Sequence, residues 1–387
     1  MVSSPVASTA LVSAISDHVK TALAPISSAI DTEGLYPADY LRELGRLGGF
    51  NAAIPTEYGG QGLDLATQID INTAIAAECG STSFLAWCQA SCAWYFLHTA
   101  NQGLRERYLQ QVASGALLAG TGMSNAIKHL AGIEKIHLSA TRDGDDYVIN
   151  GSLPWVSNVG DGHLVIVAVA VEGEGYAMLP VLCATDGLTM HNCPEFAGLE
   201  GTQTLNLRFK NVRVPTNDAL AHPAEFKHYI SRIKPGFILG QTGMAFGITA
   251  SSLKTLRESN ASSSHTNIFL DDQEGELAAE LDTLKAQTAA LARQTHTGQP
   301  AMLDVLKARA QASELVLKAA NSAVLHAGAK GYLMRHPAQR RLREAVFVAI
   351  VTPALKHLRK EIHDLELAAQ QLLTTPHAST PATIQAA

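Results

Sequence analysis

The 387-residue sequence lacks the usual marks of a nucleic-acid-binding or membrane protein. Its formal net charge is −6. Lys and Arg are scattered, which argues against a basic footprint for nucleic acid or for an anionic membrane surface. No uninterrupted apolar run is long enough to span a bilayer, and the first ten residues lack the basic and apolar stretches of a secretory signal. We therefore expect a cytoplasmic protein with neither nucleic acid nor membrane as a partner.

Cysteine is scarce and shows no metal-binding pattern. The five cysteines are odd in number and include one pair at helical spacing, Cys88 and Cys92, without a matching ligand pair elsewhere. This usage is typical of buried, reduced thiols in a reducing compartment. No cluster of His, Asp and Glu has ligand spacing either, so we predict no metal site.

Hydrophobic residues make up 47% of the chain, which is ample for a large buried core and for two or three domains. Three compositional zones follow one another, and we place the domain boundaries between them. The predicted units are an N-terminal α-helical domain over 1–118, a central β-domain over 119–222, a C-terminal four-helix bundle over 223–373 and a disordered tail over 374–387.

The first zone has helical periodicity. The segments Leu65–Cys79 and Ser83–Ala100 are rich in Ala and aromatic residues and are predicted to be buried helices. The second zone changes to strand patterns. Residues 140–151 contain an Asp-Gly turn between two short alternating runs, which indicates a hairpin. Leu164–Val171 is a continuous β-branched run typical of a buried strand, and Leu205–Val212 alternates as a half-exposed strand does.

The third zone is helical again. Long segments are predicted at Ile238–Leu256, Glu274–Arg293, Met302–His326 and Pro337–Leu373, the last interrupted near Pro353, and the polar stretch Ser259–Ser264 is interpreted as a linker. Four long helices with short connections favour a bundle. The expected fold class is therefore α+β and mainly α, with a helical domain, a central β-barrel or sandwich and a four-helix bundle.

Several short motifs in this order resemble those of the acyl-CoA dehydrogenase family. They are Leu44-Gly45-Arg46-Leu47-Gly48 followed by Ile54-Pro55-Thr56-Glu57-Tyr58-Gly59-Gly60, then Arg105-Glu106-Arg107-Tyr108-Leu109, Tyr147-Val148-Ile149-Asn150-Gly151 with Trp155-Val156-Ser157-Asn158, and Val212-Arg213-Val214-Pro215. Each is weak alone, but their common order along almost the whole chain makes the resemblance strong. The acyl-CoA dehydrogenase fold, with the three zones found here, is what the resemblance implies.

The resemblance implies a flavin cofactor, FAD with FMN as the alternative. A flavin ring needs an aromatic or apolar wall and a few hydrogen-bond donors. Trp155 could supply the wall and Ser157 a donor, although Trp155 alone is also compatible with a place in the β-domain core. The cofactor-binding residues implied by the family positions are Thr121, Gly122, Ser124, Trp155, Val156, Ser157, Gly328 and Pro353.

The sequence departs from the family where the family carries its catalytic glutamate. Leu342-Arg343-Glu344-Ala345 resembles the family segment that precedes this glutamate. The resemblance then implies that Thr352 occupies the glutamate position. A neutral hydroxyl cannot remove an α-proton without an activator. The second family base site, 234–240, contains no carboxylate. Asn125, His129 and His98 are the remaining candidates for a catalytic donor or base, and the arginine expected in 262–273 for the cofactor pyrophosphate is missing.

Three functions stay open. The first is a dehydrogenase-like flavoenzyme acting on an acyl-CoA or similar thioester with an atypical base. The second is a reduced-flavin-dependent monooxygenase of the same fold, which needs no α-proton base. The third is a non-catalytic binding protein. The resemblance also implies a homodimer or homotetramer, consistent with the low charge of the bundle helices.

Overall fold

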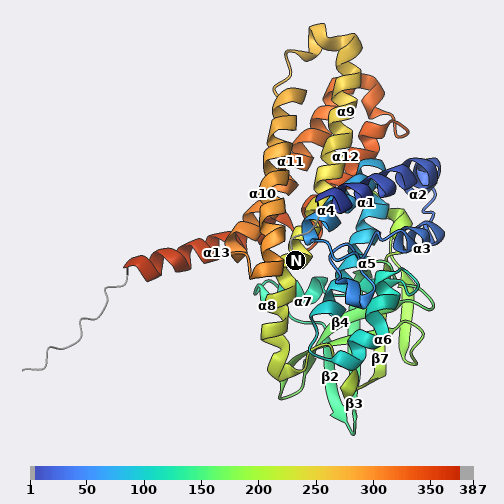
Figure 1. Cartoon of the computed structure of the whole chain (residues 1–387), viewed down its shortest axis with the longest axis vertical. Helices are drawn as coiled ribbons and strands as arrows, with labels where there is room; N and C mark the ends of the chain where they lie inside the picture. Colours follow the sequence, from blue (N-terminus) through green and yellow to red (C-terminus); the bar gives the residue numbers. More distant parts are fainter. Residues whose placement is uncertain (1–4, 375–387) are drawn as a thin grey trace, which may run out of the picture.

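The chain passes through helices, then strands, then helices again (Figure 1). The computed structural model describes residues 5–374, with side chains as far as residue 371. The mainly helical α+β class and the order of the three zones are confirmed. Among the described helices, none is long and apolar enough to cross a membrane.

The described part of the first zone contains six α-helices. They are α1 (Pro5–His18), α2 (Ser27–Thr32), α3 (Ala38–Arg46), α4 (Leu65–Glu78), α5 (Gly80–His98) and α6 (Gln102–Ala113). Helix α4 begins where the Asp64 carboxylate accepts a hydrogen bond from the Thr67 N–H at 2.8 Å. Helix α5 is buried along most of its length, as its apolar and aromatic composition predicts. It therefore forms the centre against which both other zones pack.

The second zone is one seven-stranded sheet with a short helix beside it. The elements are β1 (Ala119–Thr121), α7 (Ser124–Leu130), β2 (Leu138–Asp143), β3 (Asp146–Val156), β4 (Leu164–Val171), β5 (Gly175–Leu182), β6 (Leu188–Asn192) and β7 (Leu205–Pro215). The strand order is β1-β4-β2-β3-β7-β6, with β5 paired to β4. The predicted hairpin and the buried strand at Leu164–Val171 are confirmed. A register shift between Leu153 and Val156 turns the end of β3 outward.

The third zone consists of α8 (Pro223–Gly240), α9 (Thr242–Asn267), α10 (Glu274–Thr297), α11 (Met302–Ala327), α12 (Pro337–Ile350) and α13 (Leu355–Thr374). The predicted break near Pro353 is confirmed, and it separates α12 from α13. Figure 1 shows α9 to α12 side by side, while α13 extends away from them. The segment predicted as one helix at Ile238–Leu256 is instead divided between α8 and α9 at Gln241.

Two features of the helices differ from expectation. The Ser259–Ser264 stretch is not a linker but part of α9, which has non-helical dihedral angles only at Ser263. Here Asn267 donates to the Asn260 side chain at 2.8 Å, and this bond holds the last turns together across the kink. Helix α7 was not expected at all. The predicted tail lies outside the described residues except for Thr374, and the predicted domain boundaries stay a prediction.

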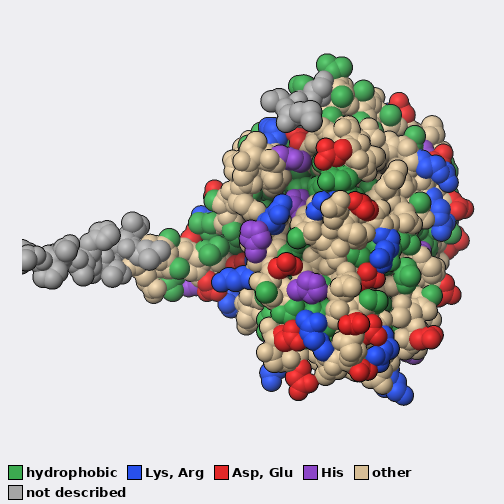
Figure 2. Space-filling view, turned by 60° about the horizontal axis from the view of Figure 1, so that its bottom comes forward, with side chains coloured by type: hydrophobic (Ala, Val, Ile, Leu, Met, Phe, Trp, Pro, Cys, Tyr) green, Lys and Arg blue, Asp and Glu red, His purple; other side chains and the backbone are tan. Residues whose placement is uncertain are grey.

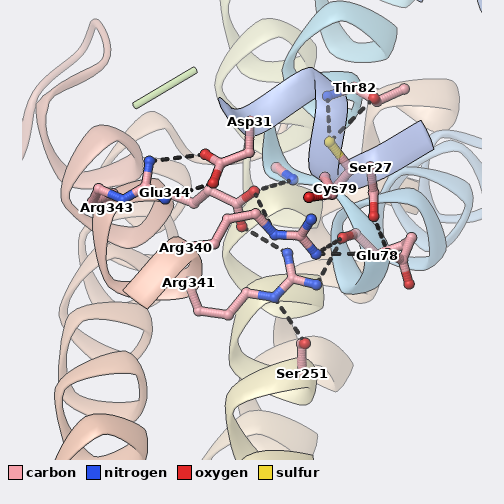
Figure 3. Close-up of polar contacts among 12 residues, drawn as sticks. Ser27, Asp31, Glu78, Cys79, Thr82, Ser251, Arg340, Arg341, Arg343 and Glu344 are labelled. Carbon is pink, nitrogen blue, oxygen red and sulfur yellow. Dashed lines mark hydrogen bonds and ion pairs between the residues drawn. The ribbon is translucent and has the colours of Figure 1, made fainter. Parts of the chain in front are cut away.

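A buried ionic network joins the bundle to the N-terminal helices (Figure 3). The Glu344 carboxylate on α12 accepts from the Gly80 N–H at 2.9 Å and from Arg341 at 2.7 Å. Arg341 also donates to the carbonyl oxygens of Ala77 and Glu78. Because these groups are removed from water, their mutual satisfaction fixes α12 against the junction of α4 and α5.

Candidate functional site

A pocket opens where β1, α7 and the end of β3 meet. Its empty volume, which includes space open to solvent, is about 400 Å³. Six predicted site residues line it, namely Thr121, Gly122, Ser124, Asn125, Trp155 and Val156. Leu153 and Pro154 add apolar wall, and Lys128, Glu134 and His137 add charge and polarity. The structure thus brings together residues from 121–137 and 153–156.

Trp155 forms an exposed aromatic wall of this pocket. Its side chain is 64% exposed, which excludes the alternative of a place in the β-domain core. The residue has φ 57°, which is uncommon for a bulky residue. Its backbone N–H donates a hydrogen bond to the side-chain oxygen of Asn206 at 3.3 Å. Such backbone strain clusters at ligand sites, and here it turns a flat aromatic ring toward the pocket rather than into the core.

The hydroxyl of Ser157 lies behind the wall and not in the pocket. Ser157 is buried, and its Oγ is 2.6 Å from the Thr204 hydroxyl, which in turn is 2.7 Å from that of Thr202. This chain of hydroxyl groups ties the end of β3 to β7 and its preceding turn. Ser157 therefore supports the position of Trp155 and Val156.

Thr121, the last residue of β1, and Gly122, which follows it, both line the pocket. The Thr121 hydroxyl is 3.0 Å from the buried Tyr95 hydroxyl on α5. At Gly122 a Cβ atom would stand 2.9 Å from the Ile166 carbonyl oxygen and 3.0 Å from Val167. Only glycine lets β1 approach β4 this closely at the base of the pocket.

Ser124 links the sheet side of the pocket to the bundle. Its hydroxyl is 2.7 Å from the Thr352 hydroxyl, at the joint between α12 and α13. The Thr352 carbonyl accepts from the Gln241 side chain at 2.8 Å. Thr352 precedes Pro353 through a cis peptide bond, and both residues are buried. Thr352, which was predicted to occupy the family's glutamate position, is thus in contact with the pocket lining.

Asn125 serves the loop after α7. Its side-chain nitrogen donates to Glu134 at 2.6 Å and to the Lys135 carbonyl at 2.9 Å, and its oxygen accepts from the His137 N–H at 2.8 Å. All of its polar atoms are therefore engaged within the loop. Asn125 shapes the pocket wall instead of presenting a free donor.

Glu134 is a pocket carboxylate that sequence reasoning missed. Lys128 donates to it at 2.8 Å. Burial alone would raise the pKa of Glu134, but the hydrogen bonds from Lys128 and Asn125 outweigh burial and hold the pKa below its ordinary value. The only signal in the sequence is an acid six residues after Lys128, across a turn at Gly132, which is too common a pattern to mark a site.

The remaining candidates lie outside the pocket lining. His129 on α7 is 2.7 Å from the Tyr176 hydroxyl through Nε2 and 3.0 Å from the Glu134 carbonyl through Nδ1. His98 packs on the Trp94 ring, and burial lowers its pKa to about 4. Gly328 ends α11 with φ 60°. None of the three meets Ser124 or Trp155 within the described chain.

A second pocket lies between α4, α5 and α8, and its empty volume, which includes space open to solvent, is about 480 Å³. Its walls are mostly apolar and aromatic, including Trp87, Trp94 and Phe237. Gly236 and Gly240 on α8 allow the two tryptophans to pack closely, because a Cβ at Gly236 would stand 2.6 Å from Trp94. The molecule thus holds a polar-edged pocket at the sheet and an apolar one among the helices.

The outer surface beside the sheet carries no charge field of one sign. Figure 2 shows Lys and Arg side chains interspersed with Asp and Glu over the face that it presents. Because the opposite charges are mixed on that face, it provides no extended positive potential that would attract a polyanion from a distance.

This fold and pocket define a class of protein in which a sheet and a helical bundle flank a ligand pocket. The chain matches the acyl-CoA dehydrogenase N-terminal domain over residues 7–116 and the acyl-CoA dehydrogenase C-terminal domain over residues 251–352, together more than half of its length. The protein belongs to the acyl-CoA dehydrogenase family and is a flavin-dependent oxidoreductase of that type.

Individual relatives span nearly the whole chain. A probable acyl-CoA dehydrogenase of Bacillus subtilis is 27% identical over 355 residues, and the match covers 87% of this chain and 91% of the Bacillus protein. The structure of glutaryl-coenzyme A dehydrogenase in complex with glutaryl-CoA superposes with a TM-score of 0.86 at 22% identity, covering 96% of this chain and 97% of the other. Dibenzothiophene monooxygenase from Paenibacillus superposes with a TM-score of 0.78 at 18% identity, covering 93% and 97%.

Proposed function

We propose that this enzyme binds FAD at the pocket beside Trp155 and oxidises an acyl-CoA or a similar thioester. The observation that carries the proposal is the exposed Trp155 ring standing over a pocket whose other side carries the Ser124 hydroxyl. A flavin is a flat apolar plate with polar edges, and this wall and these hydroxyls fit it. When bound, the flavin supplies the hydride acceptor of the reaction.

The chain's own residues hold and shield the reacting groups. Trp155, Leu153 and Pro154 line one side of the pocket with apolar surface. Thr121 and Ser124 place hydroxyl groups at its edge. Lys128 is the cation in the lining, but it is paired with Glu134. FMN, which lacks the pyrophosphate linkage, is therefore the alternative cofactor.

The apolar cavity between α4, α5 and α8 supports the proposal that the substrate carries an acyl group. Its walls of Trp87, Trp94 and Phe237 suit a hydrocarbon or other apolar group. The names of the relatives point to thioesters as well, since glutaryl-CoA is bound in one of the superposed structures. Acyl-CoA is the substrate class that this cavity and these relatives favour together.

Proton removal in this enzyme depends on an atypical base. Thr352 stands at the family's glutamate position and is hydrogen-bonded to Ser124. On α8, Lys234 is paired with Glu361. Glu134 is the carboxylate of the pocket lining, but Lys128 and Asn125 keep it ionised and weakly basic. A base of ordinary strength is therefore not supplied by these positions.

A reduced-flavin-dependent monooxygenase is the second candidate. One observation favours it, namely that Thr352, the residue predicted at the glutamate position, presents a neutral hydroxyl paired with that of Ser124. The superposition on dibenzothiophene monooxygenase supports the fold for such a reaction. This reaction needs a dry pocket with a hydroxyl donor and no base.

One anaerobic assay and one aerobic assay separate the two candidate reactions. The purified protein is loaded with FAD or FMN and its absorbance spectrum is recorded, then short acyl-CoA substrates are added without oxygen. Bleaching of the bound flavin is the result expected for the dehydrogenase. Oxygen uptake with a supplied flavin reductase, coupled to substrate oxygenation, would favour the monooxygenase. A chain that takes up neither flavin would contradict both and leave a binding protein.

Exposed apolar side chains at one end of the bundle support self-association, which we propose gives a homodimer or homotetramer. Ile268 and Phe269 after α9 and Tyr332, Leu333 and Met334 before α12 are all more than 60% exposed. Surfaces of this kind mark interfaces. Analytical ultracentrifugation of Phe269→Ser should show a shift toward smaller species.

A further inference from the structure

Arg309 on α11 is a fully buried cation without an acidic partner. Its side chain is 0% exposed. Its Nε donates to the Gln241 oxygen at 2.9 Å, one terminal nitrogen to the Val348 carbonyl at 2.6 Å, and the other to the Ser313 hydroxyl. Within the described residues it forms no ion pair. Burial lowers the pKa of Arg309 to about 10, so the group stays charged at neutral pH.

A buried charge with only neutral partners is costly, on the order of several kcal/mol. Part of that cost is offset because Val348 lies in the last turn of α12, where helix carbonyls carry partial negative charge. A methionine could fill the same space without the cost. The presence of a guanidinium at this buried position therefore needs an explanation beyond packing. Its hydrogen-bond partners form a path toward the pocket.

Gln241 connects Arg309 to Thr352. Because an arginine can only donate, the Gln241 oxygen must face it. The Gln241 amide nitrogen then faces the other way and donates to the Thr352 carbonyl at 2.8 Å. The Thr352 hydroxyl in turn meets that of Ser124, which lines the pocket. Four elements, α11, the α8–α9 joint, the α12–α13 joint and α7, converge along this path.

We propose that Arg309 supplies the positive potential of an anion-accepting position at Thr352, so that the ligand bound there presents an oxyanion or an oxygen that becomes negative during reaction. Arg309 acts through Gln241 and is a positioning residue. These contacts lie within the chain, and none of them requires that the cofactor be a flavin.

The other charged groups around this position do not cancel the potential. From the α7 side come Lys128 and Glu134, which neutralise each other. From α13 come Lys356 and His357, and burial together with the charges of Lys356 and Lys128 lowers the pKa of His357. Nearby, Lys234 is matched by Glu361. The balance that remains is positive, and Arg309 is its buried part.

The test introduces a carboxylate at the position and compares it with a neutral group of the same shape. Thr352→Glu and Thr352→Gln are unfolded in urea at pH values from 4 to 8. If the potential is positive, the folded-state pKa of the introduced carboxyl is depressed. Its stabilisation is then present above the unfolded-state pKa and is lost as pH falls through the folded-state pKa. A depression of about one pKa unit makes the unfolding equilibrium constant of Thr352→Glu roughly tenfold smaller than that of Thr352→Gln at pH 7.

Two further comparisons test whether the stability difference between Thr352→Glu and Thr352→Gln comes from Arg309. Ile350→Glu and Ile350→Gln, at a 63% exposed position of the same joint, should differ little at any pH. In an Arg309→Lys background the tenfold advantage should persist, and in Arg309→Met it should vanish. If Thr352→Glu is less stable than Thr352→Gln at pH 7 with Arg309 intact, the proposal is overturned. This first comparison decides even if Arg309→Met does not fold. An advantage that survives unchanged in Arg309→Met overturns it equally.

Discussion

Replacement of Glu344 by glutamine should destabilise the fold far more than removal of a surface acid. Glu344 is 2% exposed and accepts hydrogen bonds from the Gly80 N–H and from Arg341. Glutamine keeps the size and one acceptor, so the bond from Gly80 can remain. What is lost is the charge that faces Arg341, itself 2% exposed, and the nearby Arg340.

Breaking a buried ion pair typically costs about 3–5 kcal/mol, because the remaining charge stays buried and uncompensated. Arg341 retains the carbonyl oxygens of Ala77 and Glu78 and the Ser251 hydroxyl as acceptors. These contacts place the expected loss at the lower end, about 3 kcal/mol, or roughly a hundredfold in the unfolding equilibrium constant. Urea unfolding followed by circular dichroism measures it.

Glu314→Gln is the matched control. Glu314 pairs with Arg359 at 2.6 Å, but the two side chains are 46% and 65% exposed. Such a surface pair contributes about 0–1 kcal/mol. The reasoning is refuted if both variants lose the same free energy, since burial of the network would then not determine its contribution.

Three further predictions concern the pocket and its surroundings. Trp155→Ala should weaken flavin binding at least about tenfold in fluorescence titration, since the ring is the exposed wall, while leaving the unfolding free energy nearly unchanged; a large loss of stability would instead indicate a core role. Gly122→Ala should cost about 1–3 kcal/mol, because its Cβ would press on the Ile166 carbonyl at 2.9 Å, whereas Gly275→Ala, with open space around it, should not destabilise. His98 is neutral when folded, with its pKa lowered to about 4 by burial, so the unfolded state takes up a proton first as pH falls from about 6.5 toward 4 and stability drops by on the order of 3 kcal/mol; His98→Gln should flatten that part of the curve of unfolding free energy against pH.

The regular parts of the fold could be predicted because local pattern and burial agree there. Leu164–Val171 is apolar at every position and becomes a strand with both faces covered. The Ser259–Ser264 stretch was misinterpreted because serine favours turns when isolated, whereas here tertiary packing of α9 overrides that preference.

The pocket was only partly visible in the sequence. Trp155 stands in a motif that resembles the family's, and Thr121 and Ser124 were assigned from the corresponding family positions, so a common pocket for the three could be predicted. Glu134 and Arg309 belong to no such motif, and their importance arises from contacts with residues six or more positions away in the sequence, Lys128 and Gln241. Asn125 was predicted to be a catalytic donor, but its side chain is hydrogen-bonded within the loop after α7. No local sequence pattern indicates these hydrogen bonds.

The ion pair between Lys128 and Glu134 decides how basic the pocket carboxylate is, and this can be measured without a substrate. Lys128→Met removes a donor at 2.8 Å, so the pKa of Glu134 should rise. A depressed folded-state pKa contributes stability above the unfolded-state pKa, which is lost as pH falls through the folded-state pKa. The variant should therefore be less stable than the parent at pH 7, with the difference shrinking as pH approaches 3.

Because both side chains are about a quarter exposed, the difference at pH 7 should stay near 1 kcal/mol. Lys360→Met, which breaks the exposed pair with Asp364 at 2.7 Å, controls for the loss of a positive charge. A difference for Lys128→Met that is constant from pH 3 to pH 7 would show that Lys128 acts through packing. Glu134 would then keep its ordinary acidity and become the strongest base available in the pocket.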